Sequence, residues 1–442
     1  MNLEIVTPGM KLKELREKLG IKQHELAGNQ ITRNLISMME NDKASITEPT
    51  AKILSENINH ICKNKKIDFN VLPDFFEDTV EKQLELVFQE FILKITNEES
   101  DFIKENYEQY ILKMEDLLIR FNDKFKKYSL YKLLGDKYYE SNDYEAAYTY
   151  YIKAYENSYS LLSKEEYCRL LLTLSNCCIR LKRYDESIYN NNLAIANKDS
   201  ISKELAYNIM FNSLLSYKNM NNREKVLSEL SVLEKNFSDE INKSIKRKFE
   251  CMTIHGNCLR ELNKFNEAIK KYKQLLDLLD LNALEFQMVT LCNLLETYIN
   301  INDRKNIKMY LNKSLGLMKR YEELSHRPYS EYIYYDIGIA ARRAGDDDIA
   351  IKYLDKGIKY SRVSKNDQIL LNSFEELLEV YINMEITEEI DELKNQFLEV
   401  MSLDLLNLEC ILTLKFIKYY NSIKDFDTIN QITEFVLSLK TR

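Results

Sequence analysis

Apolar residues near the start of the chain recur every three or four positions, which is the spacing of one face of an α-helix. Leu12, Leu15 and Leu19 predict a first amphipathic helix, and Gly20 marks its end because glycine is favoured just beyond a helix C-terminus. A short second helix is predicted from residue 21, with Leu26 on its buried face. The pattern therefore begins with two short helices joined by a tight turn.

A third and a fourth helix complete this N-terminal region. The Thr32 hydroxyl is placed to cap a third helix that runs through Ile36 to Glu40. Glu48 and Pro49 open a fourth helix, since proline is well tolerated in the first helical turn. The spacing predicts a compact bundle of four helices within residues 1–66.

The rest of the chain is periodic. Tyr131, Leu134, Gly135 and Tyr138 occur in a pattern that resembles the tetratricopeptide repeat, a hairpin of two helices. Later in each copy, a small or aliphatic residue marks the point where the two helices cross. These crossing residues are Ala147, Ser187, Val226, Ala268, Ile307, Ala350, Ile390 and Ile429. Their period of about 40 residues predicts eight hairpins, and residues 79–121 are expected to add a connecting helix and a ninth, degenerate hairpin.

Composition favours an all-α chain that acts by binding. Only 9 Gly and 4 Pro occur in 442 residues, which is too few turn residues for a sandwich or barrel of many strands. Glycine-rich nucleotide motifs and His- or Ser-based catalytic motifs do not occur in the sequence, and the eight cysteines lack C-x-x-C spacing. We therefore expect no enzyme activity, no cofactor and no metal site.

The ends and the apolar runs of the sequence indicate where the chain acts. The first twenty residues carry charges every few positions and lack the apolar centre of a secretory signal. No stretch approaches the roughly 20 apolar residues that a membrane-spanning helix needs. We expect a cytoplasmic chain without membrane spans.

Charge is distributed unevenly. The whole chain has a formal net charge of −8, but residues 1–66 hold 11 Lys and Arg against 8 Asp and Glu, a balance of +3. The remaining residues therefore carry −11. Because a phosphate backbone rewards local cation density, only the N-terminal region is expected to meet a polyanion.

The N-terminal residues carry a family resemblance. The string from Leu19 to Lys43 resembles the helix-turn-helix of phage-repressor and XRE-type regulators, with Gln at the start of the second helix and Glu-Asn just after the third. The turn between these helices is one residue shorter than in the family and has lost its late glycine. We expect Asn29 to take the left-handed conformation there instead.

This resemblance implies that the third helix lies in the major groove of duplex DNA. Arg can present two donors to guanine, and Asn can present one donor and one acceptor to adenine. Other polar residues around the turn would bind phosphate and fix the register of the domain. The expected base contacts are Arg33, Asn34, Ser37 and Met38, and the expected phosphate contacts are Gln23, Thr32 and Lys43.

The repeats are expected to stack into a right-handed α-solenoid whose first helices line a concave groove. Asn side chains in such a groove can hold an extended peptide backbone, because an amide both donates and accepts hydrogen bonds. Arg260 and Arg342 could bind a carboxylate, such as a peptide C-terminus. The positions expected to face the groove are Tyr139, Asn176, Asn208, Asn212, Asn257, Arg260, Asn293, Tyr332, Tyr335 and Arg342.

The combination of both parts resembles the RRNPP family of peptide-responsive transcriptional regulators. It implies a homodimer that binds a near-palindromic DNA operator and receives a short signalling peptide in its groove, as in quorum sensing or phage lysis-lysogeny decisions. The expected domains are a DNA-binding domain (1–66), a linker helix (67–85) and a peptide-binding and dimerisation domain (86–442). Two alternatives remain. The repeats could be a scaffold that docks a partner protein while the N-terminal bundle tethers it to DNA. The chain could also be an inhibitor or phosphatase of a response regulator, but the intact helix-turn-helix argues against this as its main role.

Overall fold

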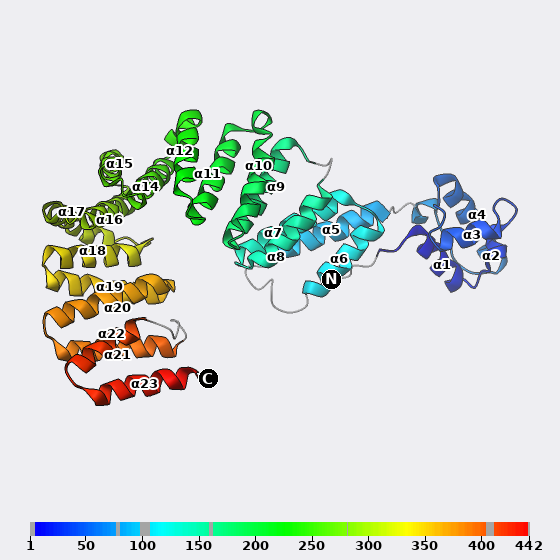
Figure 1. Cartoon of the computed structure of the whole chain (residues 1–442). Helices are drawn as coiled ribbons and strands as arrows, with labels where there is room; N and C mark the ends of the chain where they lie inside the picture. Colours follow the sequence, from blue (N-terminus) through cyan, green and yellow to red (C-terminus); the bar gives the residue numbers. More distant parts are fainter. Residues whose placement is uncertain are drawn as a thin grey trace. The chain divides into compact units, whose positions relative to one another are not determined.

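The computed structural model describes residues 5–76, 80–97, 107–158, 162–280, 282–403 and 411–440 (Figure 1). These residues form helices joined by turns, with no β-strand among them. The chain divides into two compact units, Met1–Ser200 and Ile201–Arg442. Within the described ranges, no helix is long and apolar enough to cross a membrane. The predicted all-α fold is confirmed.

The first unit begins with the predicted bundle of four helices, which we call the head. They are α1 (Pro8–Lys18), α2 (Gln23–Ala27), α3 (Arg33–Glu40) and α4 (Glu48–Asn64). Leu12, Ile36 and Leu54 are fully buried where these helices meet. The Thr32 hydroxyl accepts a hydrogen bond from the Leu35 amide at 3.2 Å, so the predicted cap of the third helix is present.

The turn between α2 and α3 differs from the expectation. Asn29 does not have a positive φ; Gly28 does, with φ of 56° and ψ of −143°. A side chain has little room there, because a Cβ atom on Gly28 would lie 3.1 Å from Asn57 Nδ2. Asn57 in turn donates to the Leu26 carbonyl at 2.9 Å. The turn therefore closes one residue earlier than predicted, where glycine meets no steric penalty.

Residues 67–85 do not form the single linker helix that was expected. A 3₁₀ turn, η1 (Pro73–Phe76), comes first, and α5 (Val80–Asn97) begins later and extends past the expected end. Residues 67–72 are not helical, and the residue before a proline is disfavoured in the helical region. The Asn59 side chain instead pairs with both backbone groups of Val71, at 2.8 and 2.9 Å.

Two further helices connect the head to the repeats within the first unit. Helix α6 (Tyr107–Arg120) packs with α5 and α7 around Phe91, Met114 and Leu134. The Gln83 side chain on α5 exchanges two hydrogen bonds with the Val6 backbone, at 3.0 and 2.9 Å. Part of the expected ninth hairpin, residues 98–106, lies outside the described residues.

The predicted hairpins follow in order. In the first unit they are α7 (Lys124–Glu140) with α8 (Tyr144–Asn157), and α9 (Lys164–Arg180) with α10 (Tyr184–Ile195), followed by the short η3 (Lys198–Ser200). The second unit holds α11 (Lys203–Asn219) with α12 (Arg223–Asn236), the short α13 (Ser238–Asn242), α14 (Ile245–Glu261) with α15 (Phe265–Leu278), and α16 (Leu284–Asn300) with α17 (Arg304–Glu322). It ends with α18 (Ser330–Ala344) and α19 (Asp347–Ser364), α20 (Asp367–Asn383) and α21 (Thr387–Ser402), and α22 (Ile411–Ser422) and α23 (Phe426–Lys440).

The crossing residues lie where the period placed them. Each is the fourth residue of the second helix of its hairpin, from Ala147 in α8 to Ile429 in α23. All are buried except Ile429, which is half-buried in the last hairpin. The period of about 40 residues is therefore the repeat length of the helical hairpins, and this prediction is confirmed.

A second feature recurs five residues before each crossing residue. The turn of every hairpin holds one residue with positive φ, which ends the first helix in a left-handed conformation. Asn, the residue other than glycine that best tolerates this conformation, occupies four of these turns. The turn residues are Asn142, Lys182, Asn221, Asn263, Asn302, Gly345, Glu385 and Lys424.

Gly135 allows a close approach between the helices of the first hairpin. A Cβ atom at this position would lie 2.5 Å from the Tyr151 ring. The Tyr151 hydroxyl donates to Asp136 at 2.9 Å, which fixes the ring over the glycine. The Gly256 and Tyr272 pair repeats this arrangement in the second unit.

Candidate DNA-binding and ligand-binding sites

Helix α3 presents an amphipathic surface in the head. Ile36 and Met39 are fully buried and hold the helix against the bundle. On the opposite side, Arg33 and Asn34 in the first turn are exposed. One turn later, Ser37 is half-buried and Met38 is 45% exposed. The structure thus brings the four predicted base contacts together on one helix.

A buried carboxylate joins the first three helices. Glu40, at the end of α3, accepts a hydrogen bond from Arg16 Nη2 at 3.1 Å and from Gln23 Nε2 at 2.7 Å. Its side chain is only 2% exposed. The hydrogen bond that Arg16 donates to Glu40 raises the pKa of Arg16 above its usual value. Sequence analysis missed Arg16 and Glu40, although a charged residue four positions after the buried Ile36 is the signal that could have found them.

The predicted phosphate contacts have different surroundings. Gln23 is half-buried and gives one amide hydrogen to Glu40, which leaves the other hydrogen for a phosphate. Thr32 is exposed beside the first turn of α3. Lys43 is exposed in the loop after α3, next to Asp42, whose φ is 55°.

A cavity of about 720 Å³ lies in the second unit. Most of its wall comes from the first helices of consecutive hairpins, namely α11, α14, α16, α18 and α20. This arrangement agrees with the expectation that first helices line the groove. Five predicted groove residues line the cavity: Asn257, Arg260, Asn293, Tyr332 and Tyr335.

The other five predicted groove residues lie elsewhere. Arg342 forms ion pairs with Glu376 and Glu379, while its neighbour Arg343 lines the cavity. In α11, Asn208 is half-buried and Asn212 is buried, and neither is part of the cavity wall. Tyr139 and Asn176 belong to the first unit.

The cavity contains hydrogen-bonding groups that the fold leaves unused. Asn293 Oδ1 lies 3.5 Å from Arg260 Nη1, but the buried Asn293 Nδ2 finds no hydrogen-bond partner among the described residues. The buried hydroxyl of Thr253 is in the same situation. Asn257 accepts a hydrogen bond from Tyr272 at 2.5 Å, so its amide nitrogen remains available. A ligand with carbonyl groups would satisfy these donors.

Asp336 is a cavity residue that sequence analysis did not predict. Desolvation raises the pKa of its carboxyl to about 8, the nearby charge of Glu296 adds to the increase, and Arg260 opposes it. Arg260 itself is paired with Glu296 at 2.5 Å. A cationic group placed beside Asp336 would favour the ionised carboxylate. No feature of the repeat pattern distinguishes this residue, because its surroundings come from several hairpins.

Other chemistry is sparse in the described ranges. No group of three or more His, Cys, Asp and Glu side chains in these ranges could hold a metal ion. The cysteines described are all buried as free thiols.

Comparisons with known proteins place the head in a family. Residues 12–59 match the family described as helix-turn-helix. No curated protein matches the sequence. Among solved structures, the apo quorum sensor NprR from B. thuringiensis is 13% identical, with a TM-score of 0.49, 88% of this chain covered and 99% of that one.

Two more solved structures show the same kind of likeness. The apo form of RapI is 15% identical, with a TM-score of 0.48, 63% of this chain covered and 97% of that one. Bacillus thuringiensis PlcR, in complex with the peptide PapR7 and DNA, is 14% identical, with a TM-score of 0.29, 62% of this chain covered and 95% of that one. The chain thus joins a domain that matches the helix-turn-helix family to a series of helical hairpins with a period of about 40 residues.

Proposed function

We propose that this chain is a sequence-specific transcriptional regulator whose DNA binding is controlled by a short signalling peptide held in the cavity of the second unit. The observation that carries the proposal is the cavity itself, in which unused amide and hydroxyl groups line a space between several hairpins. Its volume of about 720 Å³ lies within the usual range of specific ligand sites.

The polar groups of the cavity indicate which chemical groups the ligand should carry. Asn257 and Asn293 offer amide donors to the carbonyl groups of a peptide backbone, largely independently of its sequence. Asp336 lies where an amino or guanidinium group would restore its charge. The preferred ligand is therefore a short peptide with a cationic group.

Control would pass from the cavity to the head through the repeats. A peptide that contacts several first helices at once favours one spacing of those helices over another. The effect on DNA affinity is limited by the difference in peptide affinity between the two arrangements. A single head would bury only a small surface against DNA. We therefore propose that two chains form a homodimer, in which each head reads one half of a near-palindromic operator.

The test is a library of peptides of 5 to 10 residues, screened by calorimetry against the full chain. Supporting peptides bind tightly and change the affinity for duplexes that carry the promoter of the chain's own gene. The Asn257→Ala variant should lose most of this response while it keeps the helical circular dichroism of the parent. Asn208→Ala, outside the cavity wall, is the matched control.

Two outcomes would contradict the proposal. If no peptide binds and the chain instead captures a folded protein, the repeats are a docking scaffold. If peptides bind but Asn257→Ala responds like the parent, the cavity is not their site.

A further inference from the structure

The turn between α6 and α7 carries an unusual charge for its part of the chain. Residues 120–132 hold five basic residues and one acidic residue, although residues 67–442 as a whole carry −11. The basic residues are Arg120, Lys124, Lys126, Lys127 and Lys132. Nothing in the helical repeat requires this local excess of positive charge.

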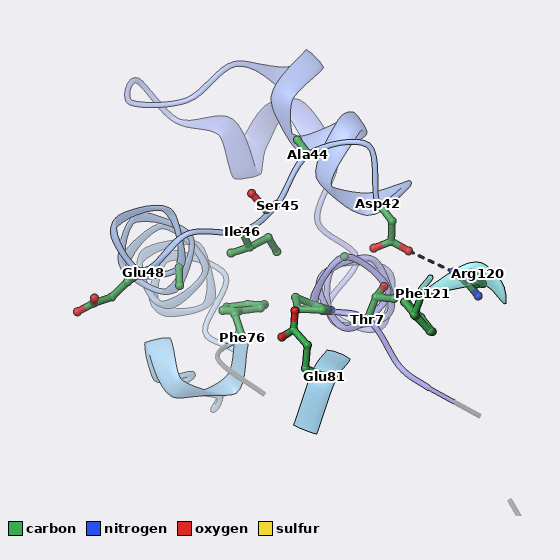
Figure 2. A pocket seen from close by; sticks show the side chains of 13 residues that line it. Thr7, Asp42, Ala44, Ser45, Ile46, Glu48, Phe76, Glu81, Arg120 and Phe121 are labelled. Atoms are coloured by element: carbon green, nitrogen blue, oxygen red, sulfur yellow. Dashed lines mark ion pairs between the residues drawn. The ribbon is translucent and has the colours of Figure 1, made fainter. Parts of the chain in front are cut away.

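This turn lies against the loop that follows the recognition helix α3. Arg120 Nη2 is 3.8 Å from Asp42 Oδ2, and Asp42 directly precedes Lys43, a predicted phosphate contact. Arg120 and Phe121 line a cavity of about 740 Å³ together with Asp42, Ala44 and Ser45 of the head. Figure 2 shows Arg120 and Phe121 next to Asp42. The basic turn therefore sits beside the part of the head that is expected to meet DNA.

Two of these basic residues, Lys126 and Lys132, already form ion pairs within the first unit. Lys126 pairs with Glu85 at 3.0 Å and with Asp123 at 2.8 Å, and Lys132 pairs with Asp136 at 2.7 Å. These contacts brace the turn against α5 and along α7.

Three cations remain for another partner. Within the described ranges, neither Lys124 nor Lys127 forms an ion pair with a carboxylate. The one carboxylate near Arg120 there is the distant Asp42; the Arg120 guanidinium also lies 5.4 Å from the centre of the Phe121 ring, and its side chain is 48% exposed. Lys124 is the first residue of α7 and Lys127 lies one turn later, near a helix end where the dipole disfavours cations. A contribution to folding stability therefore does not explain why lysines occupy these two positions.

We propose that the turn between α6 and α7 is a second DNA-phosphate contact, in which Arg120, Lys124 and Lys127 bind the backbone of the duplex that α3 reads. The inference rests on the proposed function only in that the head binds DNA. Phosphate contacts supply affinity but no direct sequence information. The first helices after the head would thus enlarge the DNA footprint beyond the helix-turn-helix domain.

The experiment measures binding of the full chain to a random-sequence duplex of about 40 base pairs over a range of salt concentrations. The logarithm of the association constant falls as the logarithm of the salt concentration rises, and each lost phosphate contact makes this slope shallower by about 0.9. The double variant Lys124→Gln, Lys127→Gln should therefore have a slope that is shallower by about 1.8, and its binding should be at least about 10-fold weaker near 0.1 M salt. Adding Arg120→Gln should make the slope shallower still.

The control variant Lys182→Gln, Lys198→Gln removes the same charge from exposed positions of the first unit, around α10. Its slope should match that of the parent, which would separate a local contact from a general effect of net charge. Equal slopes for parent, double variant and control would overturn this inference while leaving the DNA-binding head in place. A parent chain that binds no duplex at all would overturn both proposals.

Discussion

The Gln23 amide donates to Glu40 Oε2 at 2.7 Å, across the turn between the two helices of the DNA-binding motif. Arg16 donates to the same carboxylate from α1. One nearly buried acceptor therefore sets the position of α3 relative to its neighbours. Gln23, which we expect to bind phosphate, thus also supports the helix that we propose reads the bases.

Replacing Glu40 should loosen the head. Glu40→Ala removes the main carboxylate partner of Arg16, which keeps only Glu17 at 3.4 Å and the Ile21 carbonyl at 3.1 Å, so the free energy of unfolding should fall by about 1–3 kcal/mol. Hydrogen exchange of the amides of residues 33–40 should therefore become markedly faster. Glu56→Ala, at an exposed position of α4, is the control. Unchanged exchange in Glu40→Ala would show that α3 does not depend on this carboxylate.

Arg33 should contribute to sequence preference. Arg33→Ala removes a side chain that can donate two hydrogen bonds to guanine, so discrimination at one base pair should fall by about 1–3 kcal/mol. Selection of bound duplexes from a random pool reads this change directly. Lys43→Ala, at a predicted phosphate contact, should weaken all sequences about equally. Uniform losses in both variants would remove the base-reading role of Arg33.

Gly135 and Gly316 should respond in opposite directions to the same substitution. Gly135→Ala forces a methyl group against the Tyr151 ring and should lower the free energy of unfolding by about 1–3 kcal/mol. Gly316 lies inside α17 with no atom within 4 Å of an added Cβ, so Gly316→Ala should raise it by about 0.5–1 kcal/mol. Thermal denaturation compares the two variants. Equal effects would mean that the Gly135–Tyr151 contact does not limit the first hairpin.

Asp336 should make stability depend on pH. Its carboxyl has an ordinary pKa of 3.8 and a pKa of about 8 in the folded chain, which therefore binds the proton more tightly than the unfolded chain does. This stabilisation is complete below about pH 4 and is lost as pH rises through 8. Asp336→Asn cannot lose a proton, so its free energy of unfolding should fall less than that of the parent between pH 6 and 9.

Urea denaturation at the two pH values gives this comparison. Asp199→Asn, at an exposed position, should behave like the parent. A parent and an Asp336→Asn variant with the same pH dependence would show that the Asp336 carboxyl is already ionised in the folded chain.

The pattern of apolar residues was enough to predict the four helices of the head, the eight hairpins and the residues at which the hairpins cross. These features depend on short-range spacing: Ala147 and its counterparts recur because each pair of helices must bury one face, and Thr32 caps α3 from an adjacent position. The same local pattern placed Arg33 and Asn34 together on the exposed side of α3.

The way in which these elements converge could be seen only in the folded chain. Asp336 acquires its raised pKa, and five of the ten predicted groove residues share one cavity, because first helices from several hairpins meet there. Glu40 is buried by partners on two other helices, and the turn after α2 closes at Gly28 because Asn57 packs against it. Exclusion of water and distances between helices arise from packing across the chain, so no local pattern of residues contains them.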